Sequence, residues 1–172
     1  YNHLQSIILW GPSVFGKTTL ARIICSQMGA HFEQMSAVLD GVKELRNIIK
    51  HAELYKQNNK STILFVDEIH RFNKAQQDGF LPHIESGLLT LIGATTENPS
   101  FEINSALLSR ARVYVLKKLS YEELELIALR AMKVQQIALE DDGSLALVIE
   151  NSDGDARRPV SYTHLTLPTS YA

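Results

Sequence analysis

A glycine-rich turn between a short apolar run and a helical pattern constrains this chain more than any other feature. The run from Ser6 to Trp10 is apolar after its first residue, as expected for a strand buried on both faces of a parallel sheet. The turn then reads GPSVFGKT from Gly11 to Thr18, and from Lys17 to Met28 apolar residues recur at helical spacing. Strand, glycine turn and helix in this order predict the start of an α/β sheet.

The turn fits the pattern G-x-x-x-x-G-K-[ST], in which backbone N–H groups and a helix N-terminus bind phosphate. In this chemistry the Lys17 ammonium neutralises the β- and γ-phosphates, and the Thr18 hydroxyl ligates Mg²⁺. The alternative is a chance glycine turn with an exposed lysine. We favour binding of ATP and Mg²⁺ because the flanking strand and helix are those that the motif requires. The expected binding residues are Gly11, Pro12, Ser13, Val14, Phe15, Gly16, Lys17, Thr18 and Thr19.

Further apolar runs alternate with helical patterns along the next hundred residues. A helix is predicted from Val42 to Tyr55, where apolar residues recur at helical spacing. Strands alternating with helices predict a doubly wound parallel α/β sheet of five strands, which binds ligands at the carboxyl ends of its strands. The four further strands are expected at His31–Ser36, Thr62–Val66, Leu89–Ala94 and Val113–Leu116.

The chain changes character after the fifth strand. Ser120 and Glu123 form a capping-box pattern that opens a helix to about Gln136, and a second helix is expected over 142–151. We therefore divide the chain into a sheet domain, 1–117, and a helical subdomain, 118–159. Pro159 would interrupt a helix, and 160–172 has no amphipathic period, so we expect a disordered or non-native tail. The start without methionine suggests a piece of a longer protein.

Composition excludes several classes of protein. Hydrophobic residues make up 45% of the 172 and charged residues 21%, as in ordinary globular domains. The net charge of −2 does not call for nucleic acid, so any DNA contact should be local or shared between subunits. No apolar run is long enough for a membrane helix, which favours a cytoplasmic protein. The single cysteine, Cys25, lies on an apolar helical face and is expected to be a buried thiol.

Polar residues follow two of the predicted strands. Asp67 could hold Mg²⁺ or its water, and Glu68 could polarise the water that attacks the γ-phosphate. Thr95 and Thr96 offer hydroxyls beside that water, and Arg110 offers a cation on a short helix after Asn104. A solvated turn, turn threonines and a surface arginine remain the alternatives. Spacing alone does not decide between them for Thr96 and Arg110.

Four segments resemble the replication-associated recombination protein A family. They read ILFVDEIHRFNK over 63–74, FLPHIE over 80–85, GATTENPSF over 93–101 and LLSR over 107–110. The family comprises AAA+ ATPases related to clamp-loader subunits and to the ATPases that interact with the Werner helicase. The resemblance covers about Ser6 to Arg158.

The resemblance implies a role for each polar residue. The strand before Thr96 would lie between the strands of Gly11 and Asp67, with Thr96 as first sensor. Arg110 would be a finger that reaches the ATP of a neighbouring subunit, and Arg157 would be the second sensor in a helical lid. An arginine finger supplied in trans raises GTPase rates about 10³–10⁵-fold, so hydrolysis should require an oligomer.

The resemblance also implies partners and a cellular role. The family acts in DNA replication and repair at stalled forks, binds DNA ends and single-stranded DNA-binding protein, and forms homo-oligomers. A nucleoid-associated cytoplasmic protein is expected. Arg71 and Lys74 could contact DNA phosphates, although solvated surface cations are as good an interpretation.

Two departures from the family pattern affect the expected activity. Family loops carry a glycine where this chain has Val14, and a β-branched residue forced to positive φ costs about 1–3 kcal/mol. Pro159 stands where the family continues its lid helix, so the helix that carries Arg157 is expected to be cut short. Weakened ATP binding and hydrolysis are therefore expected. A clamp-loader subunit and a hydrolysis-impaired ATP-sensing scaffold are the alternative functions.

Overall fold

The structure, a computed structural model, describes residues 4–13, 16–136, 143–152 and 154–158. The chain forms two compact units, Tyr1–Leu116 and Lys117–Ala172, whereas the sequence placed the boundary after residue 117. Val14 and Phe15 of the glycine-rich loop lie outside the described residues, as do Pro159 and the predicted tail 160–172.

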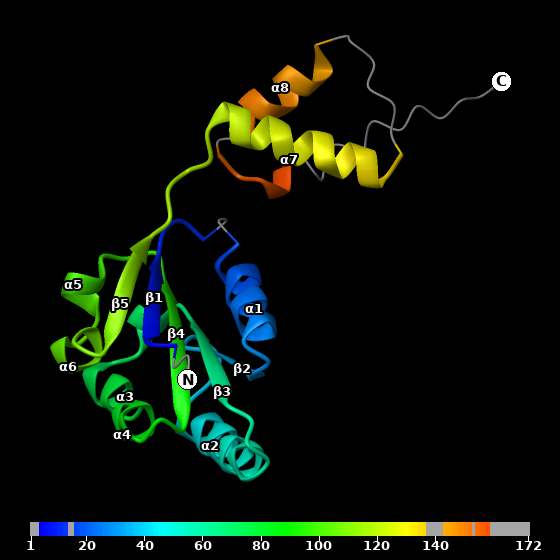
Figure 1. Cartoon of the computed structure of the whole chain (residues 1–172). Coiled ribbons are helices and arrows are strands. Elements are labelled where there is room, and N and C mark those ends of the chain that lie inside the picture. Colours follow the sequence, from blue (N-terminus) through cyan, green and yellow to red (C-terminus); the bar gives the residue numbers. More distant parts are fainter. Residues whose placement is uncertain (1–3, 14–15, 137–142, 153, 159–172) are drawn as a thin grey trace. The chain divides into compact units, whose positions relative to one another are not determined.

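The first unit is built on a five-stranded parallel sheet (Figure 1). Its strand order is β2-β3-β4-β1-β5, so the predicted insertion of β4 between β1 and β3 is confirmed. The fifth strand starts two residues earlier than predicted and ends one residue earlier. The strands are β1 (Ser6–Trp10), β2 (His31–Ser36), β3 (Thr62–Asp67), β4 (Leu89–Thr95) and β5 (Ala111–Val115).

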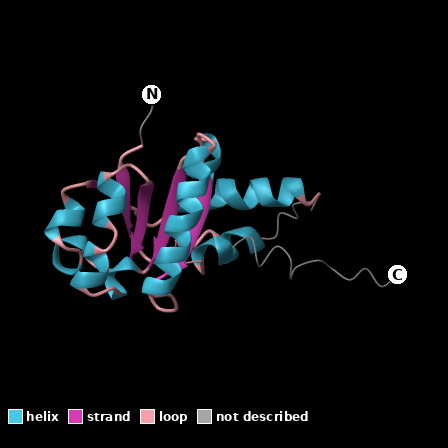
Figure 2. Ribbon diagram, turned by 90° about the horizontal axis from the view of Figure 1, so that it is seen from below, coloured by secondary structure: helices cyan, strands magenta, loops and turns pink. Residues whose placement is uncertain are grey.

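Helices cover both faces of the sheet (Figure 2). Side chains of β1 alternate, so that Ile7 packs in the core beside α1 and Ile8 packs in the core on the opposite face. Burial on both faces explains why β1, β3 and β4 consist mostly of apolar residues. The helix on one face is α1 (Lys17–Gln27); the opposite core includes residues of α2 (Val42–Gln57), the 3₁₀ helix η1 (Ile69–Arg71), α4 (Leu81–Glu85) and α6 (Ser105–Leu108). Two further short helices are α3 (Lys74–Asp78) and α5 (Pro99–Glu102).

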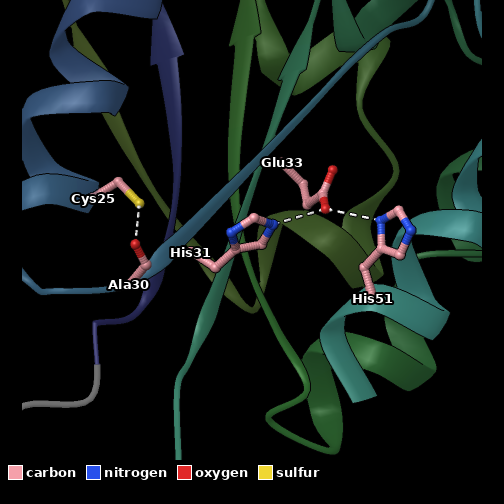
Figure 3. Close-up of polar contacts among 5 residues, drawn as sticks. All are labelled: Cys25, Ala30, His31, Glu33 and His51. Atoms are coloured by element: carbon pink, nitrogen blue, oxygen red, sulfur yellow. Dashed lines mark hydrogen bonds and ion pairs between the residues drawn. The ribbon is translucent and has the colours of Figure 1, made fainter. Parts of the chain in front are cut away.

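Edge strand β2 is joined to α2 by a carboxylate that lies between two histidines (Figure 3). Glu33 Oε1 lies 2.8 Å from His31 Nε2 and 3.1 Å from His51 Nδ1. The His31 ring also stacks on Tyr55, with 3.7 Å between ring centroids. These contacts fix the edge strand to its covering helix.

Cys25 is a buried thiol, as predicted. Its side chain is in the α1 core, and its Sγ lies 3.1 Å from the carbonyl oxygen of Ala30 (Figure 3). Burial raises the pKa of the thiol, while Lys60 and Arg22 lower it by a smaller amount. A thiol with a raised pKa carries little thiolate and is a poor nucleophile.

The second unit contains α7 (Tyr121–Val134) and α8 (Ser144–Glu150). The predicted capping box is confirmed: Ser120 Oγ accepts from Glu123 N–H at 3.3 Å, and Glu123 Oε2 accepts from Ser120 N–H at 2.8 Å. The predicted start of the second helix, at 142, lies outside the described residues. Within the described ranges, no helix has the length and apolar character needed to cross a bilayer.

Candidate functional site

The glycine-rich loop leaves the sheet at the carboxyl end of β1, between β4 and β5. Gly11 N–H donates to the Thr95 carbonyl at 3.1 Å. A Cβ at Gly11 would lie 2.9 Å from both the Cβ and the carbonyl oxygen of Leu116. Only glycine fits this close approach.

Helix α1 begins directly after the loop, and no side chain among the described residues caps its first backbone donors. Its N-cap, Gly16, has φ 67°, which favours glycine. The first turn carries no acidic residue. The N–H groups of Lys17, Thr18 and Thr19 are therefore available to an anion and lie at the positive end of the helix dipole.

Lys17 turns its ammonium group back over the loop. The residue is 5% exposed, and its Nζ donates to the carbonyls of Gly11 at 2.8 Å and Pro12 at 2.7 Å. Burial lowers the pKa of Lys17, and the nearby Asp67 and Glu68 carboxylates oppose that shift. The loop lysine and the two acids thus share one electrostatic environment.

Asp67 and Glu68 stand at the carboxyl end of β3. Asp67 ends the strand, and its Oδ1 accepts from Glu68 N–H at 3.0 Å. Glu68 has φ 49° and ψ 46°, an uncommon conformation for a residue with a side chain. Its carboxylate lies 3.3 Å from Arg71 Nε. Such backbone conformations concentrate at functional sites.

The end of β4 is bonded to the segment that follows β3. Thr95 is 1% exposed, and its Oγ1 lies 2.9 Å from His70 Nδ1 and accepts from Glu97 N–H at 3.0 Å. His70 thus connects the segment after β3 to the end of β4. Thr96 is exposed beside this pair. The sequence did not single out Thr95 as the buried hydroxyl, because both threonines follow the apolar run.

The residues at the carboxyl edge of the sheet, by which we mean the side where the parallel strands end, fit ATP with Mg²⁺. Among the described residues, no group of three or more His, Cys, Asp or Glu side chains could hold a metal. Mg²⁺ is usually bound by one or two carboxylates together with substrate phosphates and water. Thr18 and Asp67 offer the hydroxyl and carboxylate that such a site needs, and Lys17 offers the cation.

Arg110 lies at the amino edge of the sheet, by which we mean the side where the parallel strands begin. It precedes β5, whose first residue, Ala111, pairs with Ser6 at the start of β1. The loop begins five residues further along β1, about 16 Å away at 3.3 Å per residue. The structure also corrects the predicted placement of Arg110 on a helix: α6 is capped by Asn104 but ends at Leu108, two residues earlier.

Arg157 belongs to the second unit. Its Nε lies 3.4 Å from Asp155 Oδ1, and its N–H donates to the same oxygen at 2.9 Å. The role of Arg157 as second sensor remains a prediction, as do the roles of Val14 and Phe15 in the loop.

Gln77 is an internal link that the sequence did not predict. It is 1% exposed; its Nε2 donates to the carbonyls of Phe72 at 3.0 Å and Glu102 at 2.9 Å, and its Oε1 accepts from Asn104 N–H at 2.8 Å. The amide joins the segment after Glu68 to the segment before Arg110. A glutamine in the polar run KAQQD gives no sign of burial.

The match to a known protein family covers most of the first unit. A model of the ATPase family associated with various cellular activities (AAA) matches residues 7–119. The chain belongs to the AAA ATPase family. The matched range of this AAA ATPase domain includes the loop, both acids, Thr96 and Arg110.

Individual relatives support the narrower resemblance. The chain is 55% identical over 166 residues to "Replication-associated recombination protein A" of Escherichia coli (strain K12), which covers 92% of this chain and 37% of that protein. It is 46% identical over 169 residues to "ATPase WRNIP1" of Dictyostelium discoideum, covering 95% of this chain and 19% of that protein. The AAA ATPase domain therefore spans about a third or less of these curated relatives.

Solved structures have the same fold. The structure titled Thermotoga maritima RuvB Holliday junction branch migration motor superposes with a TM-score of 0.75 at 29% sequence identity, covering 94% of this chain and 53% of that one. A point variant of the same RuvB gives a TM-score of 0.77 at 30% identity, with the same coverage of both chains. The predicted AAA+ sheet is thereby confirmed.

Proposed function

We propose that this domain binds ATP with Mg²⁺ at the carboxyl edge of its sheet and hydrolyses it as the motor of a replication-fork maintenance protein. The observation that carries the proposal is the buried Lys17 ammonium, held on the loop carbonyls beside Asp67 and Glu68. Buried cations are costly unless they serve a bound anion or a structural pair. The names of the relatives, which refer to replication and recombination, supply the cellular process.

Each group at the carboxyl edge has a distinct task. The loop N–H groups and Lys17 bind the phosphates, while Thr18 and Asp67 would hold Mg²⁺, which would supply positive charge to the phosphates. Glu68 polarises the attacking water. Thr96 orients that water, and Arg157 connects the helical lid to the nucleotide.

Arg110 acts on the ATP of a neighbouring copy. Its distance from the loop of its own chain, about 16 Å along β1, exceeds the reach of the side chain. Hydrolysis then requires a homo-oligomer in which the amino edge of one sheet faces the carboxyl edge of the next. Such a head-to-tail contact closes into a ring or continues as a helix.

The substrate is DNA at forks, ends or single-stranded regions, with single-stranded DNA-binding protein as a partner and the nucleoid as the location. A RuvB structure that shares this fold is titled a Holliday junction branch migration motor. Arg71 and Lys74 are exposed on the segment that follows Glu68 and are the candidate phosphate contacts. Near-neutral net charge limits the contact to such local cations.

ATP turnover with and without DNA tests the proposal. We expect hydrolysis by this chain to be slow and to increase on addition of single-stranded DNA or DNA ends. Equal rates with and without DNA would favour an ATP-sensing scaffold. Stimulation that also requires a sliding clamp would favour a clamp-loader subunit.

Salt dependence tests the DNA contact separately. Replacing both Arg71 and Lys74 with alanine should reduce the slope of log affinity against log salt by about 2, because each phosphate contact contributes roughly one unit. The matched control replaces Lys43 and Lys50, exposed on α2, with alanine. An unchanged slope in the Arg71 and Lys74 variant would remove these residues from the interface.

A further inference from the structure

We propose that Glu85 is the positioning residue for Arg110: its carboxylate fixes the guanidinium at the amino edge of the sheet, ready for the ATP of a neighbouring copy. The inference rests on the proposed action of Arg110 in trans. It assigns a second residue to that action, from a helix that contributes nothing to the phosphate loop.

Three acceptors hold the Arg110 guanidinium. Its Nη2 lies 2.5 Å from Glu85 Oε1, and its Nη1 donates to the Ala106 carbonyl at 2.9 Å and to Ser109 Oγ at 3.1 Å. A guanidinium has five N–H donors. Three are used in these contacts, so two have no partner among the described residues. Two donors are enough for bidentate recognition of a phosphate.

The backbones that carry this pair are anchored, whereas the side chains are open to solvent. Beside Glu85, Ile84 packs against the core, and beyond α4 the chain turns at Gly87 with φ 74° before entering β4. On the other side, Leu107 is fully buried and fixes α6. The side chains of Glu85 and Arg110 remain 50% and 40% exposed. The pair therefore faces outward from a rigid base.

Positioning explains this arrangement better than stability does. An ion pair this exposed is screened by water and contributes little to folding. Its main effect is to restrict the rotamers of a long side chain before a partner arrives, which lowers the entropic cost of later binding. A neighbouring γ-phosphate can bind the two remaining donors without displacing Glu85.

Side-chain dynamics provide a test that does not depend on turnover. We would measure ¹⁵Nε–¹H order parameters of the arginines in the wild type and in Glu85→Ala, Glu85→Gln and the control Glu53→Ala, an exposed position on α2. The Arg110 order parameter should fall in Glu85→Ala, recover in Glu85→Gln, whose amide oxygen still accepts, and stay unchanged in the control. An unchanged value in Glu85→Ala would overturn the proposal.

Kinetics distinguish this proposal from the action of Arg110 itself. Glu85→Ala should lower kcat about three- to tenfold with an unchanged KM for ATP. Without Glu85, Arg110 is less well positioned for its contact in the transition state, whereas the contacts that bind ATP are unchanged. Glu85→Gln should stay within about twofold of wild type. Arg110→Ala measured in parallel separates the two ideas. If Arg110→Ala loses turnover while Glu85→Ala keeps or raises it, the role of Glu85 is wrong; if Arg110→Ala keeps full turnover, the trans action is wrong.

Discussion

The carboxyl edge of the five-stranded sheet, where its strands end, and the amino edge, where they begin, are built in opposite ways. At the carboxyl edge, the groups that would bind phosphate are backbone N–H groups and the buried side chain of Lys17. At the amino edge, the corresponding cation is the exposed side chain of Arg110, held by Glu85. One edge is fixed by burial and backbone geometry, and the other by side-chain contacts at the surface.

This difference indicates which part of the site is complete within one chain. The carboxyl edge gathers the loop, Asp67, Glu68 and the Thr95–His70 pair from three adjacent strands. The amino edge offers a cation but no phosphate-binding loop. A surface cation about 16 Å from its own loop is useful to catalysis only if another molecule approaches it. The proposed function therefore needs both edges, from two copies.

Loss of the cation at the amino edge should have the largest effect. Arg110→Ala should lower kcat about 10³-fold or more, because the finger stabilises charge that develops in the transition state. ATP affinity, measured by calorimetry, should change less than about threefold, since phosphate binding resides at the other edge. Arg112→Ala, an exposed arginine on β5, is the control and should retain turnover. A large loss of affinity in Arg110→Ala would show that the two edges are not separate.

Loss of the cation at the carboxyl edge should instead affect binding. Lys17→Met removes a charged donor, and a hydrogen bond to a charged group is worth about 1.5–3 kcal/mol, or roughly 10- to 100-fold in affinity. Titration with a fluorescent ATP analogue measures the change, with Lys50→Met on α2 as the control. Unaltered affinity would place the nucleotide elsewhere.

Replacing Gln77 tests whether its amide links the segment after Glu68 to the segment before Arg110. Gln77→Leu leaves the Phe72 and Glu102 carbonyls and the Asn104 N–H without their partner. Unfolding in denaturant should show a loss of about 2–3 kcal/mol, because buried polar groups would be unsatisfied. The exposed Gln57 provides the control, Gln57→Leu, which should change stability by less than about 0.5 kcal/mol. Equal effects of the two changes would show that the amide link is unimportant.

The smallest effect concerns the loop. If Val14 carries strain because family loops have glycine there, Val14→Gly should raise ATP affinity at least about fivefold, the lower end of that strain. Equilibrium titration of both proteins at one Mg²⁺ concentration measures the difference. Identical affinities would remove the strain argument.

The carboxyl edge was largely predictable from sequence, and the amino edge was not. The loop and Asp67 follow apolar runs that any parallel sheet buries, so their positions come from local patterns. The start of β5 was misplaced because the charged Arg112 separates Ala111 from the apolar run that begins at Val113. The pairing of Glu85 with Arg110 joins α4 to the turn after α6, 25 residues along the chain. No local periodicity encodes such a contact.

Mixing two inactive variants tests the central claim that each active site draws on both edges from different copies. Glu68→Gln lacks the group that polarises water, and Arg110→Ala lacks the finger, so each alone should hydrolyse ATP slowly. In an equal mixture, the intact finger of one copy can serve the intact Glu68 of the other. Random head-to-tail assembly makes about a quarter of the interfaces complete, so turnover should recover to about that fraction of the wild-type rate. Turnover that stays at the level of the separate variants would contradict the account.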